Sequence, residues 1–412
     1  MLELLPPPPT DPLWDLTYEF GTDERPERLN LVLGVYRDPA GSTPVMAAVR
    51  AAEIRLAERS ESKEYRGLSG NAAFNRALLG MVLGPGGPGG PADRAAAVQT
   101  VAGSGALRLL ADLVCRTRPG TTVWISDPAY VNHRPILEAA GLTVRTYAWR
   151  DAAGGFDAAG ALRDLAGAGR EDVVLLQGCC HNPTGADPAR QDWEALAGLA
   201  GRAGWVPFVD LAYHGLGDGL EADLWATRML AERVPEMLIA VSCSKNFGLY
   251  SDRTGCAIVL GASARAVRHA ETALQNAART LYSMPPEHGA AVVTTVLEDA
   301  GLRALWRTEL DLMRDRIGAN RAELTACLTA RGHGDLAATL ARQKGMFSML
   351  PLSAPGMLAL RRRFAIYGTT SGRINIAGIP EDRIPCLARG IAGVLEQPSP
   401  PTQRLAPRPR IG

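Results

Sequence analysis

The sequence contains very little lysine. Among its 412 residues only Lys63, Lys245 and Lys344 are lysines, although lysine and arginine together number 44. Arginine stays protonated in proteins and cannot act as an amine nucleophile, whereas a lysine can when burial or a neighbouring cation lowers its pKa. Each of the three lysines is therefore a candidate for chemistry that needs an amine.

Excess charge, long apolar runs and a leader pattern are also missing. The formal net charge is +1, so there is no bulk electrostatic case for binding nucleic acid or an anionic membrane. No apolar run is long enough to cross a bilayer. The N-terminal stretch MLELLPPPPT has no basic region, and its prolines interrupt any apolar core of a signal peptide. We therefore predict a cytoplasmic protein without nucleic-acid or membrane partners.

The seven cysteines show no metal-ligand spacing, and their odd number suits reduced thiols in the cytosol. We expect no metal site. No predicted strand is followed by G-x-G-x-x-G, which argues against a nicotinamide dehydrogenase.

The length allows one large domain and a smaller one. From about residue 95 to 260, strand-like segments alternate with helical ones, which is typical of a parallel sheet covered on both faces. After about residue 262 the pattern turns helical, and a final α+β segment follows. The predicted strands include AAAVQTVAG, TTVWISD, LTVRTYAW, DVVLLQGCC and WVPFVDLAY.

The stretch from Met237 to Leu260 carries the strongest chemical signal. Two apolar, strand-like runs enclose turn-rich sequence that contains Ser242, Ser244, Lys245 and Arg253. An amine in this setting favours a Schiff base with an aldehyde cofactor whose phosphate the serines and the arginine hold. The alternative is a loop lysine beside a surface arginine.

A second phosphate-binding candidate begins at Gly103. The sequence Gly103-Ser104-Gly105-Ala106 lies between a predicted strand and a predicted helix, where backbone N–H groups and the Ser104 hydroxyl can bind an anion. Small residues at such a turn also occur for packing alone, so both interpretations stay open.

Polar residues follow two further predicted strands, where α/β sheets bind ligands. Asn182 could donate to a phenolate oxygen, and Tyr213 could reach the same oxygen. Asp210 could keep a pyridine nitrogen protonated, so that the ring accepts electrons. The alternatives are an ordinary Asn-Pro turn, a helix-capping aspartate and a half-buried tyrosine.

Two arginines are candidates for binding substrate carboxylates. Arg373 lies in SGRINIAG, and Arg279 precedes LYSMPP. A guanidinium can bind a carboxylate through two parallel hydrogen bonds. Either arginine could instead form a surface salt bridge.

Taken together, these motifs make the chain similar to a known family from about Asp11 to Gly393. It resembles the class I aminotransferases of fold type I, in the aspartate and aromatic amino acid branch. The matching motifs occur in the family's order: LGVYRD, TPV, YRGLSG, GSGALR, NHRPI, CCHNPTGADP, DLAYHGLGDGL, SCSKNFGLYSDRTG, YSMPPEHGA, GMFSM and SGRINIAG.

The resemblance implies an α/β fold: a large domain (44–312) with a mostly parallel seven-stranded sheet, and a smaller α+β domain formed by 1–43 and 313–412. It implies pyridoxal 5'-phosphate bound to Lys245, which also moves the proton of the reaction. Asp210, supported by His133, holds the ring nitrogen. The residues implied to hold the rest of the cofactor are Ser104, Gly105, Tyr130, Asn182, Tyr213, Ser242, Ser244 and Arg253.

The resemblance also implies a homodimer with shared active sites. Tyr65 reaches the cofactor phosphate of the neighbouring subunit, and Arg279 from the neighbour binds a side-chain carboxylate. Arg373 binds the α-carboxylate of the amino acid or 2-oxo acid substrate, with Gly34 beside it. Tyr130 and Asn182 also face the substrate.

Two positions depart from the family pattern. Tyr130 stands where the family has a tryptophan over the cofactor ring, and Met284 where it often has asparagine. Met284 makes the pocket more apolar and adaptable. We therefore expect transfer of an amino group from an aromatic or other bulky L-amino acid to an acidic 2-oxo acid such as 2-oxoglutarate.

Three alternatives stay open. The chain could be a plain aspartate aminotransferase, or a fold type I enzyme that runs a lyase, racemase or oxidase reaction in a specialised biosynthetic pathway. It could also be a regulatory module on an inactive scaffold, although Lys245 is present and the first thirty residues are too short and Pro-rich for a DNA-binding extension.

Overall fold

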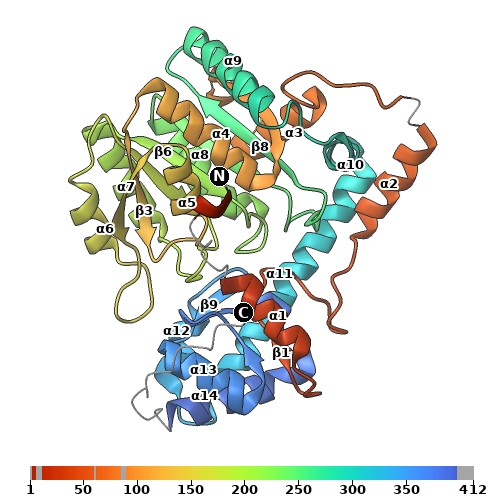
Figure 1. Cartoon of the computed structure of the whole chain (residues 1–412), viewed down its shortest axis with the longest axis vertical. Coiled ribbons are helices and arrows are strands. Elements are labelled where there is room, and N and C mark those ends of the chain that lie inside the picture. The colour runs from red at the N-terminus through yellow and green to blue at the C-terminus, as the bar shows by residue number, and fades with distance from the viewer. Residues whose placement is uncertain (1, 6–11, 60–61, 85–89, 397–412) are drawn as a thin grey trace.

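The computed structural model describes residues 2–5, 12–59, 62–84 and 90–396, and the account below is confined to them. Figure 1 shows two parts joined by a long helix: a sheet covered by helices above, and a smaller group of helices and short strands below. Expressed in residues, the helices are α1 (Pro12–Thr22), α2 (Ala47–Arg59), α3 (Ala72–Leu83), α4 (Ala102–Thr117), α5 (His133–Ala139), α6 (Ala158–Leu165), α7 (Arg190–Ala203), α8 (Leu220–Arg233), α9 (Ala264–Leu281), α10 (Glu287–Glu298), α11 (Ala300–Thr329), α12 (Gly334–Ala341), α13 (Ala354–Phe364) and α14 (Ile384–Leu395).

The large sheet has seven strands in the order β2-β8-β7-β6-β5-β3-β4. Only β8 runs antiparallel to its neighbours, so the expected mostly parallel sheet is confirmed. Every residue of the central strands β5, β7 and β8 is buried, as expected for strands covered on both faces. The strands are β2 (Ala95–Val101), β3 (Thr122–Asp127), β4 (Thr143–Ala148), β5 (Val173–Gln177), β6 (Val206–Leu211), β7 (Met237–Ser242) and β8 (Thr254–Leu260).

Two layers of helices cover this sheet. Helices α4, α5 and α9 pack on one face, and α3, α6, α7 and α8 lie on the other. Several helices begin at a side chain that accepts backbone N–H groups, as Asn71 does for α3 and Ser263 for α9.

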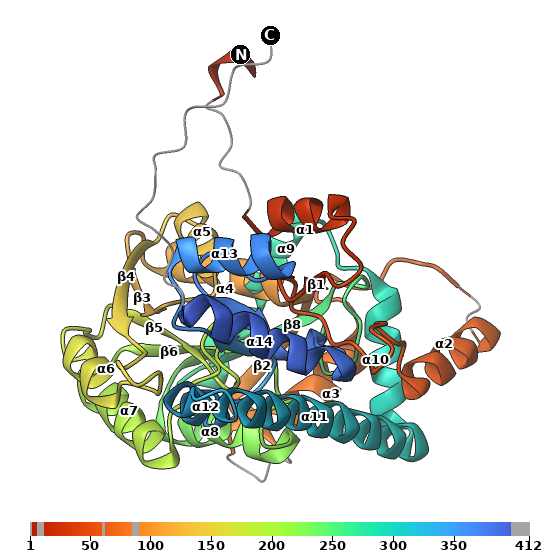
Figure 2. The same ribbon diagram turned by 90° about the horizontal axis from the view of Figure 1, so that it is seen from below.

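The lower part contains two small sheets and α12, α13 and α14 (Figure 2). Strand β1 (Leu29–Asn30) pairs parallel to β10 (Ile366–Tyr367), and β9 (Phe347–Met349) pairs antiparallel to β11 (Arg373–Asn375). The predicted boundary at 312/313 falls inside the continuous helix α11. The division into two domains at the stated bounds stays a prediction.

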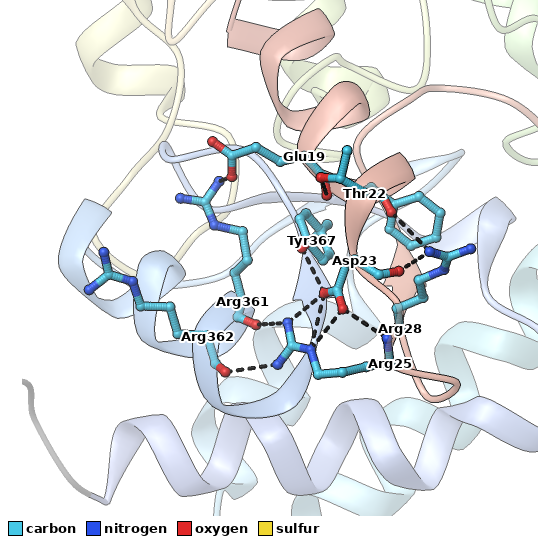
Figure 3. A network of polar contacts seen from close by, with 9 residues as sticks. Glu19, Thr22, Asp23, Arg25, Arg28, Arg361, Arg362 and Tyr367 are labelled. Atoms are coloured by element: carbon cyan, nitrogen blue, oxygen red, sulfur yellow. Dashed lines mark hydrogen bonds and ion pairs between the residues drawn. The ribbon is translucent and has the colours of Figure 1, made fainter. Parts of the chain in front are cut away.

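A polar network ties the N-terminal helix to α13 and β10 (Figure 3). The Arg25 guanidinium donates to the Asp23 carboxylate and to the carbonyls of Arg361 and Arg362. The Tyr367 hydroxyl also donates to Asp23, at 2.7 Å. The hydrogen bond from Arg25 is the largest cause that lowers the pKa of Asp23 well below its usual range. Segments more than 330 residues apart in sequence are thereby held together.

Candidate active site

A cavity of about 250 Å³ lies at the carboxyl ends of β5, β6 and β7 and at the start of α4. This is the edge of a parallel sheet where ligands bind in α/β folds. Its lining contains most of the residues singled out from the sequence: Leu33, Gly34, Val35, Ala102, Gly103, Ser104, Leu107, Tyr130, Gln177, Asn182, Asp210, Ala212, Tyr213, Ser242, Ser244, Lys245, Tyr250 and Arg253.

Lys245 places its amine over the ring of Tyr213, with Nζ 4.8 Å from the ring centroid. Loss of solvation is the main cause that lowers the pKa of Lys245 to about 8, and the charges of Arg253 and Arg373 act in the same direction. Asp210 opposes them. The amine is therefore neutral in a larger fraction of molecules than an ordinary lysine, which suits it to attack a carbonyl carbon.

Asp210 lies at the end of β6 and binds a buried histidine. Its Oδ2 atom is 2.8 Å from His133 Nε2. His133 Nδ1 is buried and has no hydrogen-bond partner among the described residues. A proton on Nδ1 would be a buried donor without an acceptor, so we assign the ring proton to Nε2, which donates to Asp210. His133 thus fixes the carboxylate and leaves its other oxygen to the cavity.

Asn182 connects the cavity to the lower part of the chain. Its Nδ2 donates to the Tyr213 hydroxyl at 3.0 Å, and its Oδ1 accepts from Arg373 Nη1 at 3.1 Å. The Gln177 side chain binds both backbone polar groups of Asn182: its Oε1 accepts from Asn182 N, and its Nε2 donates to Asn182 O. Burial raises the pKa of the Tyr213 hydroxyl well above its usual range.

The opposite end of the cavity is rich in hydroxyl groups. Ser242 Oγ donates to Ser244 Oγ at 3.1 Å, and Ser104 lies in the first turn of α4. The N-cap residue of α4 is Val101, which makes no side-chain cap. Ala102 N donates to the Arg253 carbonyl at 2.9 Å, so the N–H groups that follow Ala102 in the first turn are the ones available to an anion. A Cβ atom on Gly103 would lie only 3.0 Å from Ser242 Cβ. Glycine therefore keeps this end of the cavity open.

These groups fit a pyridoxal phosphate cofactor. Hydroxyls, a helix N-terminus and Arg253 suit its phosphate, the Asp210 carboxylate suits its ring nitrogen, and the Lys245 amine suits its aldehyde. Buried Arg373 Nε has no partner among the described residues, which leaves a donor for a carboxylate. These are groups that the sequence singled out, and their roles toward the cofactor stay a prediction.

Some predicted site residues do not line this cavity. Gly105 lies one residue beyond Ser104 in α4, outside the lining. Tyr65 is 93 % exposed, and Arg279 is exposed at the end of α9. Met284 is half-buried outside the lining. Within one chain, the structure does not bring Tyr65, Arg279 or Met284 to Lys245. Arg373 is also absent from the lining and is connected to the cavity by its hydrogen bond to Asn182.

Sequence reasoning missed two polar residues of the lining. Gln177 is the last residue of β5, and its position at a strand end was the available signal. Tyr250 accepts a hydrogen bond from Tyr36 N at 2.9 Å, a contact between segments 214 residues apart that no local pattern indicates.

A buried cluster of Cys179, Cys180 and Asp223 has donor atoms within 4.8 Å of one another. The Asp223 oxygens already accept backbone N–H groups from Gly215, Gly217 and Asp218. Burial also helps to raise the pKa of both thiols. The carboxylate therefore serves to hold the loop after β6, and all seven cysteines are free.

Comparisons with known proteins agree with this geometry. The family model "Aminotransferase class I and II" matches residues 26–391. The chain is 42 % identical to the aromatic-amino-acid aminotransferase of Paracoccus denitrificans, with 96 % of this chain and 100 % of that protein covered. It is 41 % identical to the aspartate aminotransferase of Haemophilus influenzae, with the same coverage.

The fold comparison gives the same result. The aromatic-amino-acid aminotransferase of Burkholderia pseudomallei, solved covalently bound to pyridoxal phosphate, superposes with a TM-score of 0.93 and 35 % identity, covering 96 % of this chain and 99 % of that one. Among the described residues no helix is long and apolar enough to cross a membrane. The protein therefore belongs to the class I and II aminotransferases, which are pyridoxal-phosphate-dependent enzymes.

Proposed function

We propose that the cavity around Lys245 is the active site and that its residues divide the work of transamination. The observation that carries this proposal is the convergence of Lys245, Asp210 and Asn182 on one cavity, with His133 bound to Asp210 and Arg373 bound to Asn182 from outside the lining. The cofactor, when bound, supplies an aldehyde carbon and an electron sink for charge that develops at the substrate Cα. Lys245 would hold the cofactor until the substrate amine displaces it, and the freed Lys245 amine would then move the proton from the substrate Cα to the former aldehyde carbon of the cofactor.

Asp210 orients the cofactor, and Arg373 orients the substrate. The Asp210 carboxylate, fixed by His133, holds a proton on the cofactor ring nitrogen. Arg373 binds the substrate α-carboxylate with its planar guanidinium, which the Phe347 ring supports from one face at 4.5 Å. Asn182 and Tyr213 bind the ring oxygen, and Ser104, Ser242, Ser244 and Arg253 bind the phosphate.

The enzyme is, in this proposal, a cytoplasmic homodimer with shared sites. Tyr65 and Arg279 are exposed in the single chain and lie outside its cavity, so their proposed roles require a second copy. Further apolar side chains on the same surface elements are exposed, namely Ile54 on α2 and Leu281 on α9. An ion pair of 3.3 Å from Arg66 to Glu287 fixes the loop that carries Tyr65 beside α10.

The proposed donor is an aromatic or other bulky L-amino acid, and the proposed acceptor is an acidic 2-oxo acid. Tyr130 lines the cavity and packs edge-to-face on His133, with the ring centroids 5.2 Å apart. It therefore offers an aromatic surface of smaller area than a tryptophan would. Met284, supplied by the neighbour together with Arg279, adds adaptable apolar surface. Similarity to both aromatic and aspartate enzymes keeps aspartate as the competing donor.

Lys245 is expected to be the single attachment point of the cofactor. Borohydride reduction of the purified enzyme followed by peptide mapping should place the label on Lys245. In cofactor-free protein the rate of cofactor attachment should rise with pH and level off above about pH 8, because the neutral amine is the nucleophile and its pKa is lowered to about 8. Lys63→Arg is the matched control and should label normally; a label on Lys63 or Lys344 would contradict the assignment.

Asp210→Asn should keep the fold and the cofactor but lower kcat at least about a hundredfold, as removal of a preorganised electrostatic partner does. The change removes the negative charge while keeping the shape and a hydrogen-bond acceptor for His133. Steady-state kinetics and cofactor content measure the two effects separately. Asp112→Asn, away from the cavity, should change neither. Wild-type turnover in cofactor-loaded Asp210→Asn enzyme would show that the charge has no such role.

Mixing inactive Tyr65→Ala and Lys245→Ala subunits should restore activity. A hybrid dimer contains one site with both lesions and one with none, so random exchange should give about a quarter of the wild-type activity. Native mass spectrometry would verify that the subunits exchange. If hybrids form and no activity returns, the sites are not shared through Tyr65.

Substrate preference is tested by kcat/KM for aspartate, phenylalanine, tyrosine and tryptophan, each with 2-oxoglutarate as acceptor. The aromatic donors should exceed aspartate. Arg279→Ala should weaken use of 2-oxoglutarate by about tenfold or more, because a bidentate partner of the side-chain carboxylate is lost. An advantage of aspartate by orders of magnitude would make the enzyme an aspartate aminotransferase, and unchanged use of 2-oxoglutarate would remove Arg279 from the site.

A further inference from the structure

A second polar cavity lies between the sheet part and the lower part of the chain. Its volume is about 370 Å³, and it shares no lining residue with the cavity around Lys245. The loop that precedes α8 forms one wall, the middle of α11 forms another, and the segment between α12 and β9 closes it. The polar and charged lining residues are Asp218, Arg314, Arg321, Thr325, Arg342, Gln343 and Lys344.

Positive charge dominates this cavity. Four of its lining residues are cationic, whereas Asp218 is the only acidic one. Asp218 is paired with Lys344, and Arg314 is paired with Asp311 and Asp315 outside the lining. Arg321 and Arg342 form no ion pair with any carboxylate in the described part of the chain, so two cations remain without a neutralising partner.

Arg321 is the more telling of the two, because its side chain is buried. It donates to Ser348 Oγ at 2.7 Å and to the Gly345 carbonyl, both of which are neutral. Desolvation lowers the pKa of this guanidinium to about 10. The charge of Asp187 opposes this shift, but the Asp187 carboxylate already accepts the N–H groups of Cys180 and His181. A buried cation of this kind costs several kcal/mol unless an anion approaches it.

Gln343 provides a second, independent observation. Its side chain is 97 % buried and lines the cavity, yet neither its Oε1 nor its Nε2 has a hydrogen-bond partner among the described residues. Buried amide groups are nearly always hydrogen-bonded. Both atoms are shielded from solvent in this position, so a ligand satisfies them when the Gln343 side chain turns toward the cavity, where an anionic oxygen accepts from Nε2 and a hydroxyl donates to Oε1.

We propose that this cavity is a binding site for a small multivalent anion, such as a phosphorylated or polycarboxylic metabolite that also carries a hydroxyl group. Arg321 and Arg342 bind its charged groups, and Gln343 binds its polar edge. The site is separate from the catalytic one. Anion binding there does not depend on the residue roles proposed above, whereas its coupling to the active site rests on the roles proposed for Asn182 and Arg373.

Occupancy of this site is transmitted to the active site through the segment that follows Gln343. Lys344 N donates to the Gly185 carbonyl at 2.7 Å, and a Cβ on Gly185 would lie 3.0 Å from Gln343 Cβ. Gly185 is three residues from Asn182, and the same segment continues into Phe347, whose ring touches Arg373 and Tyr213. An anion that orders this segment therefore stabilises the position of Asn182 and of Arg373.

The test is calorimetric titration of the cofactor-loaded enzyme with pyrophosphate, in which the bound cofactor already occupies its own phosphate site. We expect one pyrophosphate per chain, with an affinity that falls as salt is added. Arg342→Gln and Gln343→Leu should each weaken binding by about tenfold or more, that is about 1.4 kcal/mol. Arg331→Gln removes the same charge from an exposed site outside the cavity and should change the affinity less than about twofold by screening alone.

Three results would overturn the proposal. The absence of heat would show that the cavity holds water only. Equal binding by wild-type enzyme and both cavity variants would place the anion elsewhere, including at Arg373. Equal weakening of pyrophosphate binding by Arg331→Gln and Arg342→Gln would show that the loss comes from the change in net charge alone. Transmission is checked separately, because pyrophosphate should lower KM for the amino donor in wild-type enzyme and not in Arg342→Gln.

Discussion

The buried guanidinium of Arg373 is the constraint that joins the parts of this molecule. The side chain is 4 % exposed, and it donates to Asn182 Oδ1 at 3.1 Å and to the Val32 carbonyl at 2.7 Å. A charge at this depth is tolerated only where hydrogen bonds replace its hydration. The N-terminal segment, the loop after β5 and strand β11 must therefore meet at one point. Of the two partners that keep Arg373 in place, Asn182 lines the cavity and connects the guanidinium to it.

Close backbone contact around Phe347 makes that meeting point rigid. A Cβ on Gly34 would lie 2.6 Å from Phe347 Cζ, and one on Gly185 would lie 2.5 Å from the Phe347 carbonyl. Gly185 also has a positive φ of 67°, which side chains rarely adopt. Both glycines are thus required by the approach of β9, and the aromatic ring fills the space they leave. The ring then supports Arg373 on one face and contacts the Tyr213 ring edge-to-face.

Much of the fold and of the cofactor end of the site could be predicted from sequence, because local signals specify them. Apolar runs of four or five residues followed by Gln177, Asp210 or Ser242 mark where β5, β6 and β7 end, and these ends meet at one sheet edge. Two hydrogen bonds depend instead on the tertiary fold, and the periodicity of the sequence does not predict them. They join Asn182 N to Gln177 and Tyr36 N to the Tyr250 hydroxyl. Strand β1 is also shorter than the apolar run around it suggests, because it pairs with only two residues of β10.

In the proposed enzyme, the groups that perform chemistry are separate from those that choose the substrate. Asp210, Ser242, Ser244 and Lys245 lie at or just after the ends of β6 and β7, and the strands β5, β7 and β8 beside them are fully buried, so their positions follow from the core. Arg279 and Met284 lie on or next to the exposed end of α9, where substitution disturbs no buried contact of the sheet. In the proposed dimer this surface closes the neighbour's cavity. In that arrangement substrate preference can change at the end of α9 while the geometry around Lys245 stays the same, which fits the similarity of this chain, at about 40 % identity, to both aspartate and aromatic-amino-acid aminotransferases.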